Sequence, residues 1–175
     1  AYGNRGTIEV LPVQGSVYLL AGGGSNVVVQ VGDDALFVVD ANEAAMKRVI
    51  ILGAGGYGRT VYWQCMGDPH HGLVWTIGGF LDDRTSILDD FDIPARIIGN
   101  PFDYMPDPDD YVVCALGSPA DRRKYSAPLL ARSAEFITVY PDLSCPPTVS
   151  IGRGGVIERK VHIGTDSVIG EFVDI

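Results

Sequence analysis

The chain has 175 residues, 46% of them hydrophobic, and a formal net charge of −9. This length suggests one or two domains with a buried core, and the acidic balance without a Lys/Arg cluster argues against nucleic acid as a partner. No stretch reaches the roughly 18 apolar residues of a membrane helix, so we expect no membrane contact.

Short β-branched runs separated by Gly-rich or Asp-rich breaks dominate residues 1–45. The expected strands are 7–14, 17–20, 27–31 and 36–39. They predict a meander too small to be stable without a partner layer. The stretch VLPVQGSVYLLAGGGSNVVVQVGDDALFVVDAN resembles the opening strands of the metallo-β-lactamase superfamily. The HxHxDH motif of that superfamily does not follow Asp40, so we predict no metal ligands.

A second domain is expected to begin at Met46, with MKRVIILGAGGYGR. The run 49–52 predicts a buried parallel strand, and the glycines after it predict a tight turn into a helix. These glycines are Gly53, Gly55, Gly56 and Gly58. Glycine permits positive φ and close backbone approach, and a helix N-terminus favours an anion. We therefore predict a phosphate site for a nucleotide or nucleotide sugar; the alternative is a tight turn without a ligand.

The helix is expected to continue over 60–66 and to end at Gly67. The run 74–81 predicts a second strand, which ends in Asp82 and Asp83. An acidic residue at this strand end binds ribose hydroxyls in dinucleotide-binding units, so both aspartates are candidate ligands. The alternative is a helix cap or a solvated turn, because aspartate favours those positions too.

The remainder of this domain continues the alternation of strand and helix. Further strands are expected at 93–98, 112–116 and 136–139. A helix is expected from about residue 120 to 133, with Ser118 or Asp121 as its cap. Gly117 and Ser118 follow a buried strand at its carboxyl end, where open α/β sheets bind ligands. Residues 46–141 are thus predicted to form a small Rossmann-like domain.

The period of the sequence changes near its end. Isoleucine recurs every six residues, at Ile151, Ile157, Ile163, Ile169 and Ile175. This hexapeptide repeat is typical of a left-handed parallel β-helix, in which each isoleucine points inward. Residues 142–175 are predicted to be its first coil, and incomplete, because solenoids need about three repeats and a cap. The predicted fold class is α/β: a β-meander, a Rossmann-like parallel sheet and the start of a β-helix.

The cysteines are three in number and widely spaced, at Cys65, Cys114 and Cys145. This pattern predicts neither a disulfide framework nor a zinc site. A reducing cytoplasm is the expected compartment, with each cysteine packing as a small apolar residue.

Four motifs occur together after residue 45: MKRVIILGAGGYGR, GGFLDD, ALGSPADRRKY and IGRGGVIERKVHIGTDSVIGEFVDI. As a set they resemble the sugar O-/N-acyltransferases of the sialic acid O-acetyltransferase family, over residues 46–175. The resemblance implies a nucleotide-sugar or sugar substrate in the α/β domain. It also implies a homotrimeric β-helix with acetyl-CoA in grooves between subunits. The substrate-binding residues that it implies are Gly53, Gly55, Gly56, Tyr57, Gly58, Asp82, Asp83, Gly117 and Ser118.

The sequence departs from that family in three places. Tyr57 stands where the family usually has histidine, and Tyr140 precedes Pro141 where the family has His-Pro. The general-base histidine of the β-helix is expected beyond Ile175. We therefore predict no catalytic residue and no acetyl transfer for this chain. His162 is expected to be an outward or corner residue.

Two alternatives stay open at this point. The glycine loop and Asp82 also fit an NAD-binding Rossmann fragment of an oxidoreductase. The chain could instead be a non-catalytic chimeric module. Stabilisation by NAD, by a nucleotide sugar or by neither would distinguish the three hypotheses.

Overall fold

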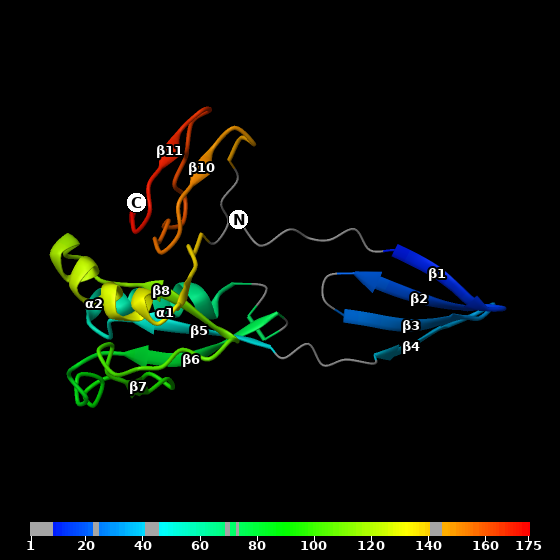
Figure 1. The fold of residues 1–175 in the computed structure, drawn as a ribbon, viewed down its shortest axis with the longest axis horizontal. Coiled ribbons are helices and arrows are strands. Elements are labelled where there is room, and N and C mark those ends of the chain that lie inside the picture. Colours follow the sequence, from blue (N-terminus) through cyan, green and yellow to red (C-terminus); the bar gives the residue numbers. More distant parts are fainter. Residues whose placement is uncertain (1–8, 23–24, 41–45, 69–70, 73, 141–144) are drawn as a thin grey trace. The chain divides into compact units, whose positions relative to one another are not determined.

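The computed structural model of the chain describes residues 9–22, 25–40, 46–68, 71–72, 74–140 and 145–175 (Figure 1). The chain divides into two compact units, Ala1–Ala45 and Met46–Ile175. No helix among these described residues is long and apolar enough to cross a membrane.

The first unit is an antiparallel meander. Its strands are β1 (Glu9–Gln14), β2 (Val17–Gly22), β3 (Ser25–Val31) and β4 (Leu36–Asp40), paired in that order. The predicted meander is therefore confirmed. Val29 is buried, but Val10, Val13 and Leu36 stay exposed, because a single sheet of this size covers little apolar surface.

The second unit contains a five-stranded parallel sheet, as predicted. Its strands are β5 (Lys47–Leu52), β6 (Trp75–Leu81), β7 (Ile97–Gly99), β8 (Asp110–Cys114) and β9 (Glu135–Phe136). All neighbouring strands are parallel, in the order β7-β6-β5-β8-β9. From β5 the chain adds β6 and β7 on one side and then β8 and β9 on the other, so the order of addition reverses between β5 and β8. In open α/β sheets, the crevice at such a reversal is where ligands bind.

Each face of this sheet is covered by one helix, α1 (Gly56–Met66) or α2 (Pro119–Ala131). Val49 and Ile51 share a buried cluster with Val61 and Tyr62 of α1. Ile50 and Leu52 belong to a second cluster with Leu129 of α2. Successive side chains of a strand point to opposite faces, so an uninterrupted apolar run is what a strand covered on both sides requires.

The packing of α1 depends on Gly58. A Cβ on this residue would overlap the carbonyl oxygen of Gly53, so the helix approaches the end of β5 with no room for a side chain. Gly53 itself has φ of +99°, which favours glycine. These two glycines therefore set the angle at which the chain turns from strand to helix.

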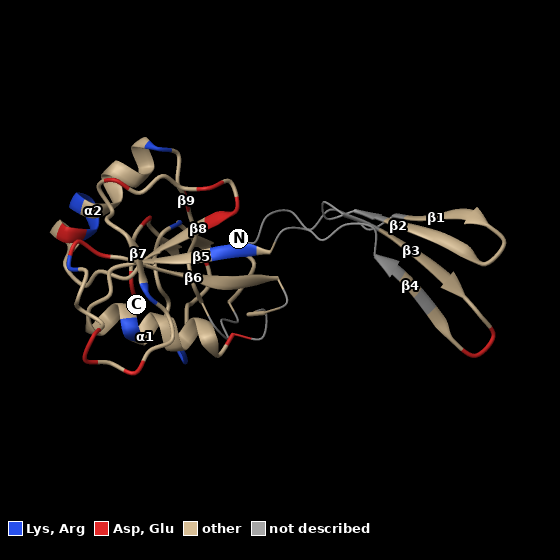
Figure 2. Cartoon of the chain, turned by 90° about the horizontal axis from the view of Figure 1, so that it is seen from below, with Lys and Arg blue, Asp and Glu red and all other residues tan. Residues whose placement is uncertain are grey.

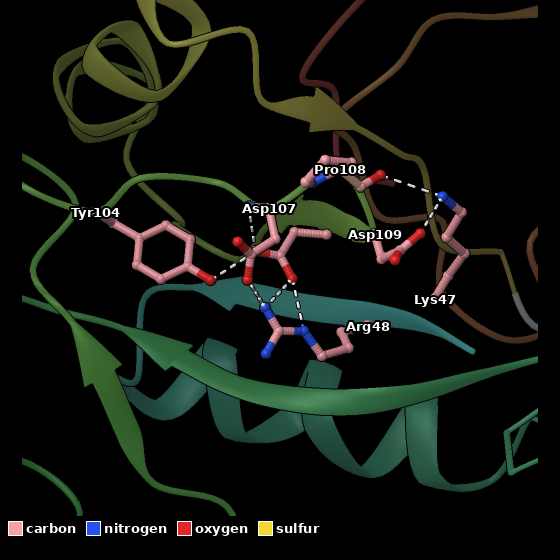
Figure 3. A network of polar contacts seen from close by, with 7 residues as sticks. Lys47, Arg48, Tyr104, Asp107, Pro108 and Asp109 are labelled. Carbon is pink, nitrogen blue, oxygen red and sulfur yellow. Dashed lines mark hydrogen bonds and ion pairs between the residues drawn. The ribbon is translucent and has the colours of Figure 1, made fainter. Parts of the chain in front are cut away.

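Charged side chains join β5 and β8 at their amino ends (Figure 3). Figure 2 shows basic residues at the start of β5, which are Lys47 and Arg48. Arg48 Nε donates to the buried carboxylate of Asp110 at 2.8 Å, and Tyr104 donates to the other oxygen at 2.6 Å. Lys47 pairs with Asp109 at 2.8 Å. These contacts hold the amino ends of β5 and β8 together.

The C-terminal residues form a coil with a regular repeat. The strands β10 (Ser150–Ile151) and β11 (Val168–Ile169) pair in parallel, with partners eighteen residues apart. Positive φ angles recur every six residues, at Gly154, Lys160, Asp166 and Phe172. Such corners divide an eighteen-residue coil into three six-residue sides, the arrangement expected of a hexapeptide repeat.

The burial of the repeated isoleucines follows their position in the coil. Ile157 and Ile163 are buried, whereas Ile175 in the second turn is 46% exposed. His162 is exposed, in agreement with the expected outward position. A Cβ on Gly155 would overlap the carbonyl oxygen of Val173, so successive turns stack closely at this corner.

Two of the predicted strands are shorter or displaced in the structure. The strand expected at 136–139 ends at Phe136, because Val139 leaves the sheet and pairs with Val156 of the coil. The strand expected at 93–98 is found at Ile97–Gly99. Phe136 also stacks edge-on against Phe172 of the coil, with ring centroids 5.0 Å apart. The parallel sheet together with α1 and α2 is called the α/β layer below. The coil therefore packs onto the core of this layer.

We predict that Gly58→Ala destabilises the second unit by about 1–3 kcal/mol, the usual cost of overpacking a close contact. Gly56→Ala is the matched control, because a Cβ there would meet no described atom within 4 Å. Urea unfolding followed by the fluorescence of the buried Trp75 measures both variants. Equal midpoints for the two variants would contradict the proposed role of Gly58.

Candidate functional site

A pocket of about 440 Å³ lies at the carboxyl edge of the parallel sheet. Leu52 and Gly53 at the end of β5, and Leu116 after β8, are among the residues that line it. Its polar lining is Asp82, Asp83, Arg84, Asp121 and Tyr125. The pocket therefore occupies the point where the strand order reverses, where ligands bind in open α/β sheets.

Gly53 of the glycine loop, residues 53–58, lines this site, and the loop leads directly into α1. Gly53 N–H donates to the carbonyl of Leu81 at 2.8 Å, which joins the loop to β6. Gly55 is the residue preceding the helix and makes no side-chain cap. All residues of the first turn of α1 are among those that the structure describes, and none of them is acidic. Its unpaired N–H groups and helix dipole thus favour an anion.

Asp82 links the glycine loop to the end of β6. Its carboxylate accepts hydrogen bonds from the N–H of Ala54 at 2.8 Å and the N–H of Arg84 at 3.0 Å. It also accepts from Nε and Nη2 of Arg84, at 2.9 and 3.0 Å. Burial alone would raise the pKa of Asp82, but the hydrogen bonds from Arg84 and Ala54 outweigh it and lower the pKa below 3.8. The buried carboxylate is ionised at neutral pH and is occupied by protein donors.

Asp83 has a different environment from its neighbour. Its carboxylate is 36% exposed and accepts a hydrogen bond from the hydroxyl of Tyr125 on α2 at 2.7 Å. The Tyr125 ring packs against Phe102, with centroids 5.3 Å apart. Asp83 is therefore the strand-end carboxylate that can exchange its present partner for a ligand hydroxyl.

A second, smaller pocket of about 310 Å³ lies where the α/β layer meets the coil. Asp174 of the coil pairs with Arg122 of α2 at 2.6 Å and lines this pocket together with Tyr57 of α1. Burial raises the pKa of Asp174, although Arg122 opposes this shift. Burial and the nearby Asp174 also raise the pKa of Tyr57. Tyr57 therefore stays protonated at neutral pH, so it can donate a hydrogen bond but cannot carry charge.

The structure distributes the nine predicted substrate-binding residues over several places. Gly53, Asp82 and Asp83 line the larger pocket, and Tyr57 and Gly117 line the smaller one. The remaining four have local roles: Gly55 and Gly56 begin α1, Gly58 packs on Gly53, and the Ser118 hydroxyl caps α2 by accepting from the N–H of Asp121 at 3.4 Å. Ligand binding by any of the nine stays a prediction.

Sequence analysis missed Arg84, Tyr125, Arg122 and Asp174. Arg84 directly follows the acidic pair, and Tyr125 lies one helical turn after Asp121, so local spacing could have indicated both. The contact between Arg122 and Asp174 joins residues far apart in the chain, and nothing in their local sequence signals it.

Neither buried cysteine is a candidate nucleophile. Burial raises the pKa values of Cys65 and Cys114 to about 12, which keeps both thiols protonated. Cys145 is a partly buried free thiol. Within the described parts of the chain, no group of His, Cys, Asp and Glu side chains could hold a metal ion.

Comparison with known proteins finds a similarity in the central part of the chain. Residues 48–129 match the family model of the PglD N-terminal domain. The acetyltransferase domain of PglB from Neisseria gonorrhoeae FA1090, solved with acetyl coenzyme A, is similar in structure with a TM-score of 0.60 and 24% identity. PerB from Caulobacter crescentus, solved with CoA and GDP-perosamine, has a TM-score of 0.59 and 21% identity. No curated protein sequence matches the chain.

The matches are partial in both directions. The PglB comparison covers 74% of this chain and 62% of the PglB domain, and the PerB comparison covers 75% and 60%. The resemblance of residues 1–45 to the metallo-β-lactamase superfamily finds no support in these matches. Residues 48–129 match the PglD N-terminal domain model, and the resemblance of residues 46–175 to the sugar acyltransferases is confirmed at the level of the fold.

Proposed function

We propose that residues 46–175 bind a nucleotide sugar and hold it for acetyl transfer from acetyl-CoA. The observation that carries this proposal is the 440 Å³ pocket at the strand reversal, between the glycine loop and the exposed carboxylate of Asp83. The similar PerB structure contains CoA and GDP-perosamine, and the similar PglB structure contains acetyl coenzyme A, which supports the same ligand classes here.

Within the pocket, the geometry suggests a division of roles. The start of α1 would accept the phosphates, because its backbone N–H groups have no acidic neighbour in the first turn. Asp83 would accept hydrogen bonds from hydroxyls of the ribose or from the base. Asp82 would act indirectly, since its oxygens already bind Ala54 and Arg84 and hold the loop to β6.

The proposed reaction is attack by a sugar hydroxyl or amine on the thioester carbon of acetyl-CoA, with CoA leaving as the thiol. A general base accepts the proton of the attacking group. We assign no described residue to that role: the raised pKa of Tyr57 keeps its hydroxyl protonated, and His162 is exposed on the coil. The residues of this chain would bind and orient the sugar. We further propose cytoplasmic location and trimerisation through the β-helix.

The first test is ligand binding by isothermal titration calorimetry. We expect UDP- or GDP-linked amino sugars to bind and to raise the melting temperature, since a ligand that binds only the native state stabilises it. NAD is the comparison ligand. Stabilisation by NAD alone would favour an oxidoreductase fragment, and no response to either ligand class would favour a non-catalytic module.

We also predict that this chain alone transfers no acetyl group. The test uses the same purified protein as the calorimetry. We expect no release of CoA thiol from acetyl-CoA when a bound nucleotide sugar is present, because no described residue is placed as the base. Thiol release that depends on the nucleotide sugar would refute this prediction.

Asp83→Asn should weaken nucleotide-sugar binding roughly tenfold, the usual effect of losing one charged hydrogen-bond acceptor. Its melting temperature should change little, because the carboxylate is partly exposed and the amide oxygen of asparagine can still accept from the Tyr125 hydroxyl. Asp103→Asn, in an exposed turn, is the control for the change in charge. Unchanged affinity of the Asp83 variant would remove this residue from the site.

Asp82→Asn should lower the free energy of unfolding by about 1–3 kcal/mol at pH 7, because a buried carboxylate with charged partners is lost. The native pKa of Asp82 lies below 3.8, so its stabilising contribution is full above that value and is lost as pH falls through the native pKa. The difference from wild type should therefore shrink below about pH 4 in urea titrations at several pH values. A difference that grows on acidification would contradict the assigned direction.

A further inference from the structure

We propose that Arg84 binds the phosphates of the substrate and makes the pocket selective for a nucleoside diphosphate sugar over an unphosphorylated sugar. This inference rests on the proposed function and adds a residue that the sequence motifs did not indicate. Three observations support this inference: the position of Arg84, the orientation of its side chain, and the charge of the pocket around it.

Arg84 lies beside the glycine loop. It lines the 440 Å³ pocket together with Gly53, and a Cβ placed on Gly55 would lie 3.9 Å from Arg84 Nη2. The guanidinium therefore lies close to the start of α1, whose first N–H groups favour an anion. A phosphate bound at the loop would be within reach of both the backbone N–H groups and Arg84.

The orientation of Arg84 is set by the buried carboxylate of Asp82. Nε and Nη2 each donate to one Asp82 oxygen, at 2.9 and 3.0 Å. A guanidinium has five N–H donors, so these two bonds leave three for other acceptors. The side chain is nevertheless 60% exposed. Arg84 thus presents a pre-ordered set of donors to the pocket, which reduces the entropy lost on binding.

The charge of the pocket gives Arg84 a distinct place in binding an anionic ligand. Three carboxylates line the pocket, those of Asp82, Asp83 and Asp121. Among the described residues of the lining, Arg84 is the only cation. The lining stays net negative even with Arg84, so this guanidinium is the group that offsets the repulsion of a diphosphate by the carboxylates. The planar fork of arginine also matches two phosphate oxygens at once, which a lysine cannot do.

The test compares ligands with and without phosphates. Calorimetry measures GDP and UDP against guanosine and uridine, for wild type, Arg84→Gln, Arg84→Lys and the control Arg153→Gln. Arg153 also forms an exposed ion pair, with Glu171 at 3.1 Å, but lies on the coil. Circular dichroism and melting curves verify that each variant is folded.

We expect Arg84→Gln to weaken binding of the preferred diphosphate roughly ten- to hundredfold, as for a lost charged hydrogen-bond donor, and to leave its nucleoside unaffected. Arg84→Lys should recover part of the loss, and Arg153→Gln should match wild type. The affinity of the wild type should fall with added NaCl more steeply than that of Arg84→Gln.

Two results would overturn the role of Arg84 while the proposed function stands. The first is that the wild type binds GDP or UDP and that Arg84→Gln binds it with the same affinity. The other is an equal loss of diphosphate and nucleoside binding, which would mean that Arg84 only supports Asp82. A wild-type protein that binds no nucleotide or nucleotide sugar would overturn the proposed function, and this inference with it.

Discussion

The turn from β5 into α1 is the constraint on which the rest of the second unit depends. Gly58 packs against the carbonyl of Gly53, and Ala54 N–H binds the carboxylate of Asp82 at 2.8 Å. The first contact brings the helix against the sheet without an intervening side chain. The second brings the end of β6 to the same loop. Together they place backbone donors, a buried acid and Arg84 around one pocket.

Much of this fold could be predicted because the sequence signals are local. The apolar run 49–52, the glycines after it and the six-residue isoleucine repeat each specify an element through its own period or turn chemistry. The ends of β7 and β9 could not be predicted in the same way. Val139 continues an apolar pattern that suits a strand, but its partner is Val156 of the coil, which only the tertiary arrangement decides.

The same distinction separates the parts of the candidate site. The glycine loop and the two strand-end aspartates were found because a known strand–turn–helix context predicts their positions. Which aspartate is available to a ligand was not predictable, because Asp82 and Asp83 are adjacent and differ only in the direction that each side chain takes. Asp82 points to Ala54, and Asp83 to Tyr125, 42 residues further along the chain.

The side chain of Arg122 is held within the α/β layer by one contact and connects that layer to the coil by two others. Nε donates to the carbonyl of Leu116, Nη1 donates to the carbonyl of Phe172 at 2.8 Å, and Nη2 pairs with Asp174 at 2.6 Å. A hinge between the α/β layer and the coil would have to break the contacts of Arg122 with Phe172 and with Asp174 together. We expect the α/β layer and the coil to move as one rigid body. The hydroxyl or amine of a bound sugar would then reach the coil because the ligand itself is long enough, and not because the two layers close on it.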